Sequence, residues 1–397
     1  MTNRRTFIKK SATVMATPLL FTKPDVFSIL SQKHLNRVRI GVIGTGSRGT
    51  GLMQILNAIE GVEIVAFCDT LPFRLKEASK ISPKAKMYEK YTDLLSDKNV
   101  DAVVISSPLN THAQIASAAV NADKHIYCEK TMVKGAQATL DLVKKVKDQH
   151  KKIFQTGHQY HSSRLYVHAV ELIKDGQIGK VHAIRAQWNR NGNWRRPVPD
   201  PMFERQINWR MYREYSYGLL AELSSHQIDF ANWLFNSHPE KVTGFGGIDY
   251  WKDGRETYDN THVVYAYPNG VKATYTCLTA NAKDDYKIYV MGDKGTLVLD
   301  YANAWIYPEG TYTKEFGEVD GVSGATTNWV EGKGIPINYA HIDPTRQALE
   351  DFRDSIMKNQ KPLSDLETGA KTAIAIDMGI QAMDSEEVVH WSNDFKI

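Results

Sequence analysis

The chain has 397 residues, of which 42% are hydrophobic and 24% are charged, and its formal net charge is +4. This length allows two domains with large cores, and the composition is ordinary for a globular protein. The charge is small and no compact basic stripe accompanies it, so the sequence gives no support for nucleic-acid binding. The three cysteines, Cys68, Cys128 and Cys277, lack the spacing of a metal site or a disulfide framework, and we expect buried free thiols.

The first 35 residues differ in kind from the rest. Arg4 and Arg5 are followed by Phe7 and two lysines, and residues 11–21 are weakly apolar. This pattern resembles a twin-arginine export signal that would direct the folded protein to the periplasm, and the alternative is a disordered basic tail. The apolar stretch is too short and too rich in Ser and Thr to cross a bilayer, so we predict no stable membrane span.

A glycine-rich turn follows the first apolar run, residues 38–43. The turn reads Gly44-x-Gly46-x-x-Gly49, and the helical pattern after it places Leu52 and Leu56 on one face. In a dinucleotide site the first glycine permits the tight turn, the second lets the backbone approach a pyrophosphate, and the third lets helix and strand pack closely. The sequence therefore predicts a dinucleotide-binding strand–turn–helix.

The second strand, expected over residues 62–68, ends at Asp69, 20 residues after Gly49. A carboxylate at this position can accept a hydrogen bond from a ribose 2′-OH and would repel a 2′-phosphate. No base follows Asp69 immediately, although Arg74 is close. We therefore predict NAD rather than NADP as the cofactor.

Strand and helix patterns alternate up to Thr156. Further buried strands are expected over residues 101–106, 124–128 and 152–156, and a long helix is expected over residues 136–149. Parallel strands joined by helices form a doubly wound sheet with right-handed crossovers. We therefore assign residues 1–35 to the export signal and a linker, and residues 36–156 to a Rossmann domain.

After Thr156 the pattern changes to β-type runs separated by turn signals. Strands are expected over residues 181–188, 242–251, 261–267, 271–278, 286–291 and 296–300. Helices over residues 345–358 and 366–383 close the chain, and we expect them to pack on the first domain. Residues 157–397 are thus predicted to form an α+β domain with an open-faced, mostly antiparallel sheet. The insertion of about fifty residues between its first two strands, 189–240, is long enough to suggest a functional segment.

These features together resemble the Gfo/Idh/MocA oxidoreductase family, which includes glucose–fructose oxidoreductase and inositol dehydrogenase. The resemblance covers the chain from Val38 to its end. It rests on the glycine turn, residues 107–112, Glu129-Lys130, residues 157–160 and the run Glu222-x-x-x-His226-x-x-Asp229. It implies a site in the cleft between the two domains and a homo-oligomer, a dimer or tetramer, formed through the C-terminal sheet.

Within the family, residues 190–196, 207–210, 221–227 and 250–257 resemble exported bacterial members that oxidise glycosides at a ring hydroxyl, often the 3-position. Two departures from the family pattern are present: Thr131 stands where the family has proline after the lysine, and Glu222 stands where it has aspartate. The glycine turn and the resemblance together place these residues at the NAD: Gly44, Gly46, Ser47, Arg48, Gly49, Asp69, Arg74, Ser107, Pro108, Asn110, His112, Glu129 and Lys130.

Oxidation of an alcohol needs a base for the hydroxyl proton and a donor that holds the oxygen. His226 is the expected base because imidazole titrates near neutral pH and because it occupies the family's histidine position. Glu222, four residues earlier, would share its face on a helix and could orient the ring. Lys130 follows a strand at its carboxyl end, where ligands bind in open α/β sheets, and we expect its ammonium group to polarise the oxygen. A purely structural role is the alternative for each.

The insertion is dense in Trp, Arg and Asn, which suit the C–H faces and hydroxyl groups of a carbohydrate; a core cluster or an oligomer interface has the same composition. A metal site made of His158, His161, Glu222 and His226 is a lesser alternative, because the spacing matches no metal motif, and we expect no metal. The residues predicted to line the carbohydrate pocket are His158, Tyr160, Trp194, Arg195, Trp209, Arg210 and Tyr212.

The sequence thus predicts an exported, NAD-dependent oxidoreductase that acts on a secondary hydroxyl of a sugar or glycoside. One alternative is an NAD-dependent glycoside hydrolase of the same superfamily, which would use transient oxidation, elimination and re-reduction. The other is a sugar-binding protein that keeps the dinucleotide as a structural part.

Overall fold

The computed structural model describes residues 37–309, 334–339 and 342–397. The predicted export signal lies outside the described residues. The strands of the described part form two sheets, one with six strands and one with nine. Long apolar runs build the first sheet and alternating patterns build the second, as expected for a sheet covered on both faces and a sheet covered on one.

The first sheet is wholly parallel, and its strand order is β3-β2-β1-β4-β5-β6. This is the order of the doubly wound dinucleotide-binding fold, and it confirms the predicted Rossmann architecture. The strands are β1 (Val38–Ile43), β2 (Val62–Cys68), β3 (Lys86–Tyr88), β4 (Ala102–Ile105), β5 (His125–Cys128) and β6 (Phe154–Thr156). The helices are α1 (Ser47–Asn57), α2 (Pro72–Ile81), α3 (Tyr91–Ser96), α4 (His112–Asn121) and α5 (Ala136–Gln149).

The second sheet has the order β14-β13-β12-β11-β7-β10-β9-β8-β15. Only β10 and β7 pair in parallel among its described strands, so the predicted mostly antiparallel sheet is confirmed. Its strands are β7 (Val181–Asn191), β8 (Lys241–Gly247), β9 (Asn260–Ala266), β10 (Lys272–Leu278), β11 (Ala280–Gly292), β12 (Gly295–Leu299), β13 (Ala304–Pro308), β14 (Ile335–Pro336) and β15 (Val389–His390).

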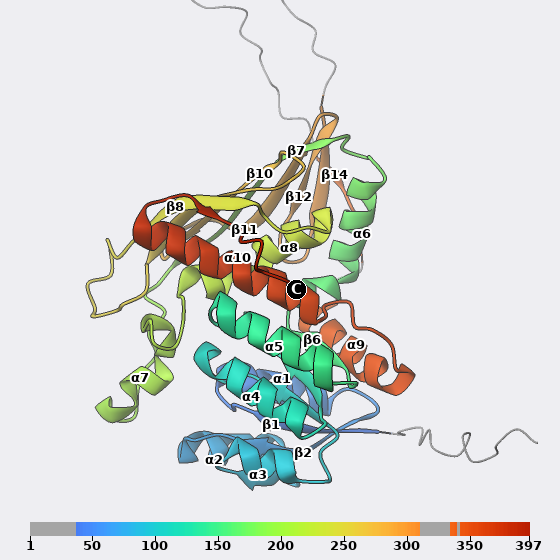
Figure 1. The fold of residues 1–397 in the computed structure, drawn as a ribbon, viewed down its shortest axis with the longest axis vertical. Coiled ribbons are helices and arrows are strands. Elements are labelled where there is room, and N and C mark those ends of the chain that lie inside the picture. Colours follow the sequence, from blue (N-terminus) through green and yellow to red (C-terminus); the bar gives the residue numbers. More distant parts are fainter. Residues whose placement is uncertain (1–36, 310–333, 340–341) are drawn as a thin grey trace, which may run out of the picture. The chain divides into compact units, whose positions relative to one another are not determined.

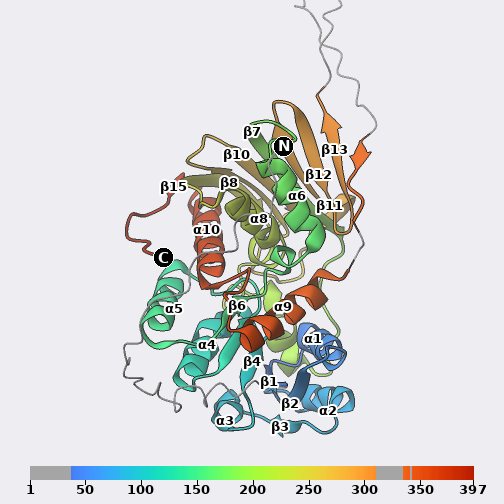
Figure 2. The same ribbon diagram turned by 90° about the vertical axis from the view of Figure 1, so that its right-hand side faces the viewer.

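Helices cover one face of the second sheet. Figures 1 and 2 show α6 (Arg164–Lys174), α8 (Ser225–Phe235) and α10 (Leu366–Ser385) packed on the same side of it. The core beneath them is rich in tyrosine, and the hydroxyl of Tyr265 donates to the carbonyl of Ala375, 2.8 Å away. The opposite face carries exposed side chains such as Phe245 and Val264.

The last two helices also contact the Rossmann domain, at strand β6 and at helix α5. Gln155 Nε2 donates to the carbonyl of Ala348 in α9 (Pro344–Lys358), 2.9 Å away, and the amide of Ala136 donates to Asp377 Oδ2 of α10, 3.1 Å away. The C-terminal helices therefore connect the two sheets and fix the cleft between them.

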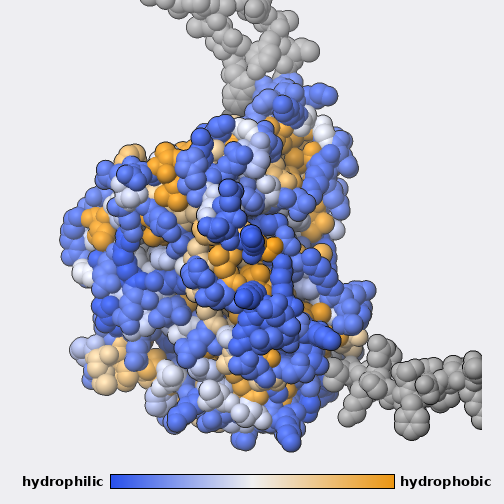
Figure 3. Space-filling model, viewed as in Figure 1, coloured by the Kyte–Doolittle hydropathy of each residue, from blue (hydrophilic) through white to orange (hydrophobic). Residues whose placement is uncertain are grey.

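The insertion between β7 and β8 contains several helical segments. It contains the short helix α7 (Glu204–Ile207), the π-helix η6 (Leu220–Ser224) and the buried helix α8. The side of the molecule in Figure 3 is mainly hydrophilic, with apolar residues in scattered patches. Within the described ranges, no helix is both long and apolar enough to cross a membrane.

Candidate active site

The glycine turn has the close backbone contacts that the sequence predicts. Gly44 has φ +90°, and a Cβ there would lie 2.6 Å from the amide nitrogen of Ser107. A Cβ at Gly49 would lie 1.9 Å from the carbonyl oxygen of Gly44, so helix α1 can approach β1 only without one. No side chain caps the first turn of α1. Its free N–H groups therefore remain available to an anionic group.

Asp69 ends β2 and borders the same cleft. Its Oδ2 accepts from the backbone amide of Thr45 at 2.8 Å, and its Oδ1 accepts from the amide of Leu71 at 3.0 Å. The hydroxyl of Thr45 also donates to Oδ2, at 3.2 Å. These bonds hold the carboxylate in one orientation, and Oδ1 keeps a lone pair for another donor. Asp69 is therefore placed to receive a hydroxyl group from a ligand in the cleft.

A cavity of about 800 Å³ runs along the carboxyl edge of the first sheet. The Rossmann domain contributes one wall, and the insertion contributes the other. Of the predicted cofactor residues, the cavity is lined by Gly44, Gly46, Ser47, Arg48, Asp69, Arg74, Ser107 and Pro108. The insertion lines it with Arg196, Gln206, Ile207, Trp209, Arg210 and Tyr215.

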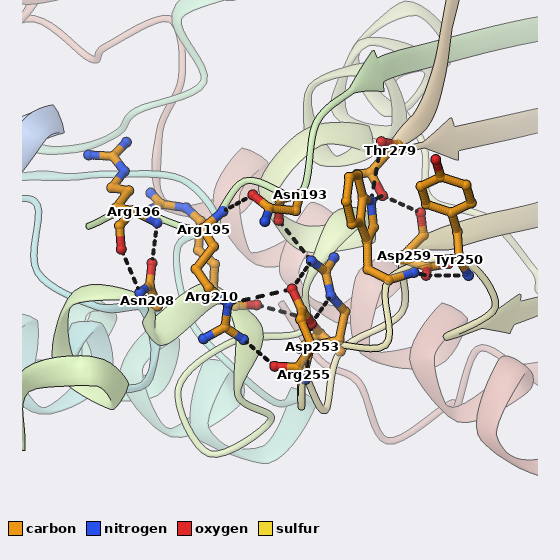
Figure 4. Close-up of polar contacts among 12 residues, drawn as sticks. Asn193, Arg195, Arg196, Asn208, Arg210, Tyr250, Asp253, Arg255, Asp259 and Thr279 are labelled. Atoms are coloured by element: carbon orange, nitrogen blue, oxygen red, sulfur yellow. Dashed lines mark hydrogen bonds and ion pairs between the residues drawn. The ribbon is translucent and has the colours of Figure 1, made fainter. Parts of the chain in front are cut away.

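Arg196 reaches from the insertion to the glycine turn. Its guanidinium group donates to Ser47 Oγ, and its backbone is held by Asn208, whose side chain bonds both the amide and the carbonyl of Arg196 (Figure 4). Burial, Arg210 and Arg74 all lower the pKa of Arg196, and no carboxylate pairs with it among the described residues. Such a cluster of arginines beside free helix N–H groups is suited to phosphate oxygens.

A second cavity, of about 260 Å³, adjoins the first. Six residues line both cavities and form the boundary between the two spaces: Arg48, Ser106, Ser107, Arg196, Trp209 and Arg210. The second cavity contains all three predicted catalytic residues, Lys130, Glu222 and His226. Its other side chains include Trp188, Arg190, Trp194, His112, Glu129 and Gln159.

Lys130 follows β5 and extends toward the insertion. Its Nζ donates to the backbone carbonyl of Glu222, 2.7 Å away. Burial lowers the pKa of Lys130, and the carboxylates of Glu222 and Glu129 act in the opposite direction. The ammonium group is thus positioned by one hydrogen bond and keeps two further donors for a ligand.

The Glu222 carboxylate makes no hydrogen bond to His226, contrary to the expected role of orienting its ring. Its Oε2 accepts from Arg210 Nε at 2.9 Å and its Oε1 accepts from Ser216 Oγ at 3.0 Å. Burial opposes its ionisation, but Arg210 and Lys130 outweigh burial and lower the pKa of Glu222. The physical reason for the difference is the π-helix: its wider turn removes the shared face that residues four apart have on an α-helix.

His226 presents one edge of its ring to the second cavity. Its Nδ1 is buried without a hydrogen-bond partner, whereas Nε2 is neither fully buried nor hydrogen-bonded. The ring packs against Tyr160 and Trp188, with ring centroids 5.3 Å and 5.6 Å away. Burial, with Lys130, His158 and Arg48, lowers the pKa of His226 well below its ordinary value. The imidazole is therefore neutral near pH 7 and able to accept a proton at Nε2.

His158 and Tyr160 do not line the second cavity, although we expected both to line a carbohydrate pocket. His158 is 1% exposed and Tyr160 is 5% exposed. Both are held in the core by ring packing: they lie against His226, with ring centroids 6.1 Å and 5.3 Å away, and Tyr160 stacks on Tyr166 with 4.3 Å between ring centroids. These two residues support the ring of His226 rather than face a ligand.

The predicted insertion residues divide into two groups. Trp194, Trp209 and Arg210 line the second cavity. Arg195 instead pairs with Asp253 (Figure 4) and with Glu204. The hydroxyl of Tyr212 donates to Glu204 Oε1 at 3.0 Å, so Arg195 and Tyr212 brace the insertion.

Of the remaining predicted cofactor residues, His112 and Glu129 line only the second cavity, whereas Gly49 and Asn110 line neither. His112 Nε2 and Nδ1 lie 3.0 Å from the carbonyl oxygens of Ser107 and Thr131, so the ring links the two segments, and Glu129 binds Arg48 Nη2 at 2.7 Å. The backbone amide of Asn110 bonds the carbonyl of Tyr215, and the Asn110 side chain lines neither cavity. No group of three or more His, Cys, Asp and Glu side chains could hold a metal ion in the described part of the chain. All three cysteines are free and buried.

Comparison with known families decides the relationship of this chain to other proteins. Residues 38–158 match the "Oxidoreductase family, NAD-binding Rossmann fold", and residues 166–298 match the "GFO/IDH/MocA C-terminal domain". Together the two matches cover more than half of the chain. The chain belongs to the Gfo/Idh/MocA oxidoreductase family.

Individual relatives agree with this family. The chain is 28% identical to a myo-inositol 2-dehydrogenase of Thermotoga maritima over 268 aligned residues. The alignment covers 66% of this chain and 75% of the relative. It is 30% identical to a glycosyl hydrolase family 109 protein of Shewanella amazonensis over 207 aligned residues. That alignment covers 47% of this chain and 44% of the relative. A solved levoglucosan dehydrogenase in complex with NADH and levoglucosan has the same fold, with a TM-score of 0.72, 18% identity and coverage of 89% and 99% of the two chains.

The first cavity fits the NAD of this family. The guanidinium group of Arg74 lies close to Gly46: a Cβ at Gly46 would be only 3.1 Å from Arg74 Nη1. Because glycine has no side chain, its backbone and the guanidinium group can approach the same phosphate oxygen. Asp69 stands where a ribose hydroxyl can donate to it. The sequence did not single out Arg196 for this site, because an arginine pair in an insertion has no spacing signal.

Proposed function

We propose that this protein is an NAD-dependent oxidoreductase that acts on a secondary hydroxyl group of a sugar or glycoside, with the 3-hydroxyl as the favoured position. The observation that carries the proposal is that His226 and Lys130 line one cavity that adjoins the dinucleotide cavity. A base, a hydrogen-bond donor for the substrate oxygen and a space for the cofactor lie next to one another there, which is the arrangement that alcohol oxidation requires.

Each polar group has a separate role in the proposed reaction. His226 accepts the hydroxyl proton at Nε2, since that nitrogen is open to the cavity and the ring is neutral near pH 7. Lys130 Nζ donates to the substrate oxygen as it becomes a carbonyl. Arg210 and Ser216 hold Glu222, whose carbonyl in turn holds Lys130. Bound NAD supplies the electron acceptor.

The second cavity suits a sugar ring. Trp188, Trp194 and Trp209 supply flat apolar faces for C–H groups, and Arg190 and Arg210 supply fork-shaped donors for hydroxyl groups. Arg190 lies 5.1 Å and 5.6 Å from the ring centroids of Trp188 and Trp194, which limits its orientations. The names of the relatives, myo-inositol 2-dehydrogenase and levoglucosan dehydrogenase, support the same substrate class.

The test is incubation with a panel of glycosides and NAD, with products identified by NMR and reduced cofactor by absorbance. The proposal predicts a keto-sugar and an equal amount of reduced NAD for at least one glycoside. Lys130→Ala and His226→Ala should each abolish most of the product. A panel that is bound but never oxidised would instead support the sugar-binding alternative.

A glycoside hydrolase is the second candidate, supported by the 30% identity to the glycosyl hydrolase family 109 protein. The oxidised ring would acidify the adjacent C–H, the aglycone would leave by elimination, and water addition and re-reduction would follow. This reaction releases the aglycone without net reduction of NAD. A p-nitrophenyl glycoside therefore distinguishes the two candidates, since only the hydrolase releases nitrophenol from a catalytic amount of NAD.

The proposal also covers the cellular location and the oligomeric state of the protein. The Arg4-Arg5 pair and residues 11–21 support export through the twin-arginine route, with a periplasmic location. The uncovered face of the second sheet, with Phe245 65% exposed, supports a dimer or tetramer formed through this sheet. Light scattering of the purified protein tests the assembly.

A further inference from the structure

The second cavity has an excess of basic side chains. Five of them line it, against two carboxylates: Arg48, Lys130, Arg190, Arg196 and Arg210 against Glu129 and Glu222. His112 and His226 line it as well, but burial lowers the pKa of both, so both rings are neutral near pH 7. Five positive and two negative groups leave the described lining with an excess of three positive charges, and a neutral sugar would compensate none of them.

The two carboxylates of the second cavity are already paired. Glu129 Oε1 lies 2.7 Å from Arg48 Nη2, and Glu222 Oε2 lies 2.9 Å from Arg210 Nε. Each of these pairs is neutral as a unit. The excess charge therefore belongs to the other three basic residues, which are Lys130, Arg190 and Arg196.

Two of these three residues have roles that every substrate would share. Arg196 donates to Ser47 Oγ in the glycine turn and also lines the first cavity, where it faces the space for the phosphates of the dinucleotide. Lys130 Nζ donates to the carbonyl of Glu222 and, in the proposed reaction, to the oxygen that is oxidised. Neither residue would therefore distinguish one sugar from another.

Arg190 has no such role. It lies near the end of β7 and lines the second cavity but not the first. Its guanidinium carbon lies 5.1 Å and 5.6 Å from the ring centroids of Trp188 and Trp194. No ion pair in the described part of the chain includes Arg190. A guanidinium group without a carboxylate partner thus stands in the substrate cavity, where two indole rings limit its orientations.

One acidic residue acts on the same neighbourhood without pairing with Arg190. Asp285 is exposed and accepts from the hydroxyl of Tyr301 at 3.3 Å. Burial, together with Asp285, raises the pKa of Tyr301, and Arg190 acts in the opposite direction. Asp285 is engaged by Tyr301 and by solvent, so the donors of Arg190 stay available to a ligand.

A carboxylate on the sugar ring fits Arg190 best. The guanidinium fork matches the two oxygens of a carboxylate, and the contact gains from both charges. The cavity, of about 260 Å³, is smaller than the roughly 300–1,000 Å³ of pockets for drug-sized ligands, so it suits a single ring. A carboxylate at C6 replaces a hydroxymethyl group without added bulk, whereas a phosphate or sulfate ester adds a tetrahedral group.

We infer that the substrate of this site is an acidic sugar, a uronic acid or its glycoside, whose ring carboxylate is bound by Arg190. This inference rests on the proposed function and narrows its substrate class. It makes Arg190 the residue that selects acidic over neutral sugars.

The test uses pairs of methyl glycosides that differ only at C6: glucoside and glucuronide, galactoside and galacturonide, mannoside and mannuronide. Calorimetry measures their affinities for the NADH-loaded protein, in which the sugar cannot be oxidised. We expect the uronide of at least one pair to bind about ten- to a hundredfold more tightly than its neutral counterpart, the scale of a hydrogen bond between charged groups.

Variants of Arg190 test the source of this preference. Arg190→Gln should reduce the ratio of the two affinities to within about twofold, and Arg190→Lys, which keeps the charge but not the fork, should retain part of it. Arg185→Gln is the matched control and should retain the whole ratio. Arg185 lies on the same strand, is exposed, stacks on Tyr289 at 4.4 Å and lines neither cavity.

Neutral glycosides that bind as well as the uronides in every pair would overturn the inference, and so would a set in which no uronide binds. A preference that persists in folded Arg190→Gln would overturn it too. Should that variant not fold, a crystal structure of the wild type with the preferred uronide decides the point: a carboxylate bonded to Arg190 supports the inference, and a carboxylate bonded elsewhere overturns it. A uronide that binds through Arg190 but never reduces NAD would contradict the proposed function alone.

Discussion

The ammonium group of Lys130 donates a hydrogen bond to the backbone carbonyl of Glu222, 2.7 Å away. Lys130 follows the fifth strand of the Rossmann sheet, and Glu222 belongs to the π-helix that leads into the helix of His226. Together with the hydrogen bond from Thr131 Oγ1 to the carbonyl of Ala221, 2.9 Å away, this contact joins the dinucleotide domain to the element that carries the candidate base. It holds the Lys130 ammonium group and the His226 imidazole beside the same cavity.

Asp69 should select NAD over NADP. We expect Asp69→Ala to weaken NAD binding by about ten- to a hundredfold, because a hydrogen bond to a charged group contributes about 1.5–3 kcal/mol. NADP binding should change far less. Calorimetry with both cofactors measures the ratio, and an unchanged ratio would remove the role assigned to this carboxylate.

Arg196 should bind the cofactor phosphates from the insertion. We expect Arg196→Ala to weaken NAD binding by about tenfold or more and to reduce its salt dependence, since a charge-assisted contact is lost. Arg195→Ala is the matched control, because Arg195 pairs with Glu204 and Asp253 and lines neither cavity. Equal affinities of the two variants would argue against the assignment.

Buried histidines should make the protein sensitive to mild acid. Burial lowers the pKa of His158 to about 4, whereas the unfolded chain has the ordinary value near 6.5. The unfolded state therefore binds the proton first as the pH falls, so stability decreases between about pH 6.5 and 4. His158 alone accounts for a loss of about 3 kcal/mol over this window. Urea unfolding should show a shallower pH dependence for His158→Gln and an unchanged one for His182→Gln.

Export should depend on the arginine pair. Replacing both Arg4 and Arg5 with lysine should trap the folded protein in the cytoplasm, because the twin-arginine route requires the pair. Cell fractionation with an antibody measures this outcome. A doubly substituted protein that still reaches the periplasm would contradict the export proposal.

The sequence predicted those features that depend on local pattern. The bounds of β1, β2 and α5 agree with the expected ranges, because a buried strand and an amphipathic helix each have a periodicity that local sequence contains. Strands β3, β13, β14 and β15 were not predicted, because they are short and owe their conformation to pairing at a sheet edge or next to one.

The site was predicted only in part, for a related reason. The glycine turn, Lys130 and His226 were found because their chemistry follows from residue type and position after a strand or in a known run. The π-helix at Leu220–Ser224 was not predicted, so Glu222 was placed beside the wrong partner. Whether His158 faces a cavity or the core, and whether Arg196 or Arg195 reaches the cofactor, depends on tertiary packing that no spacing in the sequence contains.

The turnover of His226→Ala, measured beside its NAD affinity, tests the central claim most directly. The imidazole touches the second cavity and not the first, so we expect turnover with an accepted glycoside to fall at least about a hundredfold while the dissociation constant for NAD stays within about twofold. Near-normal turnover in this variant would contradict the account.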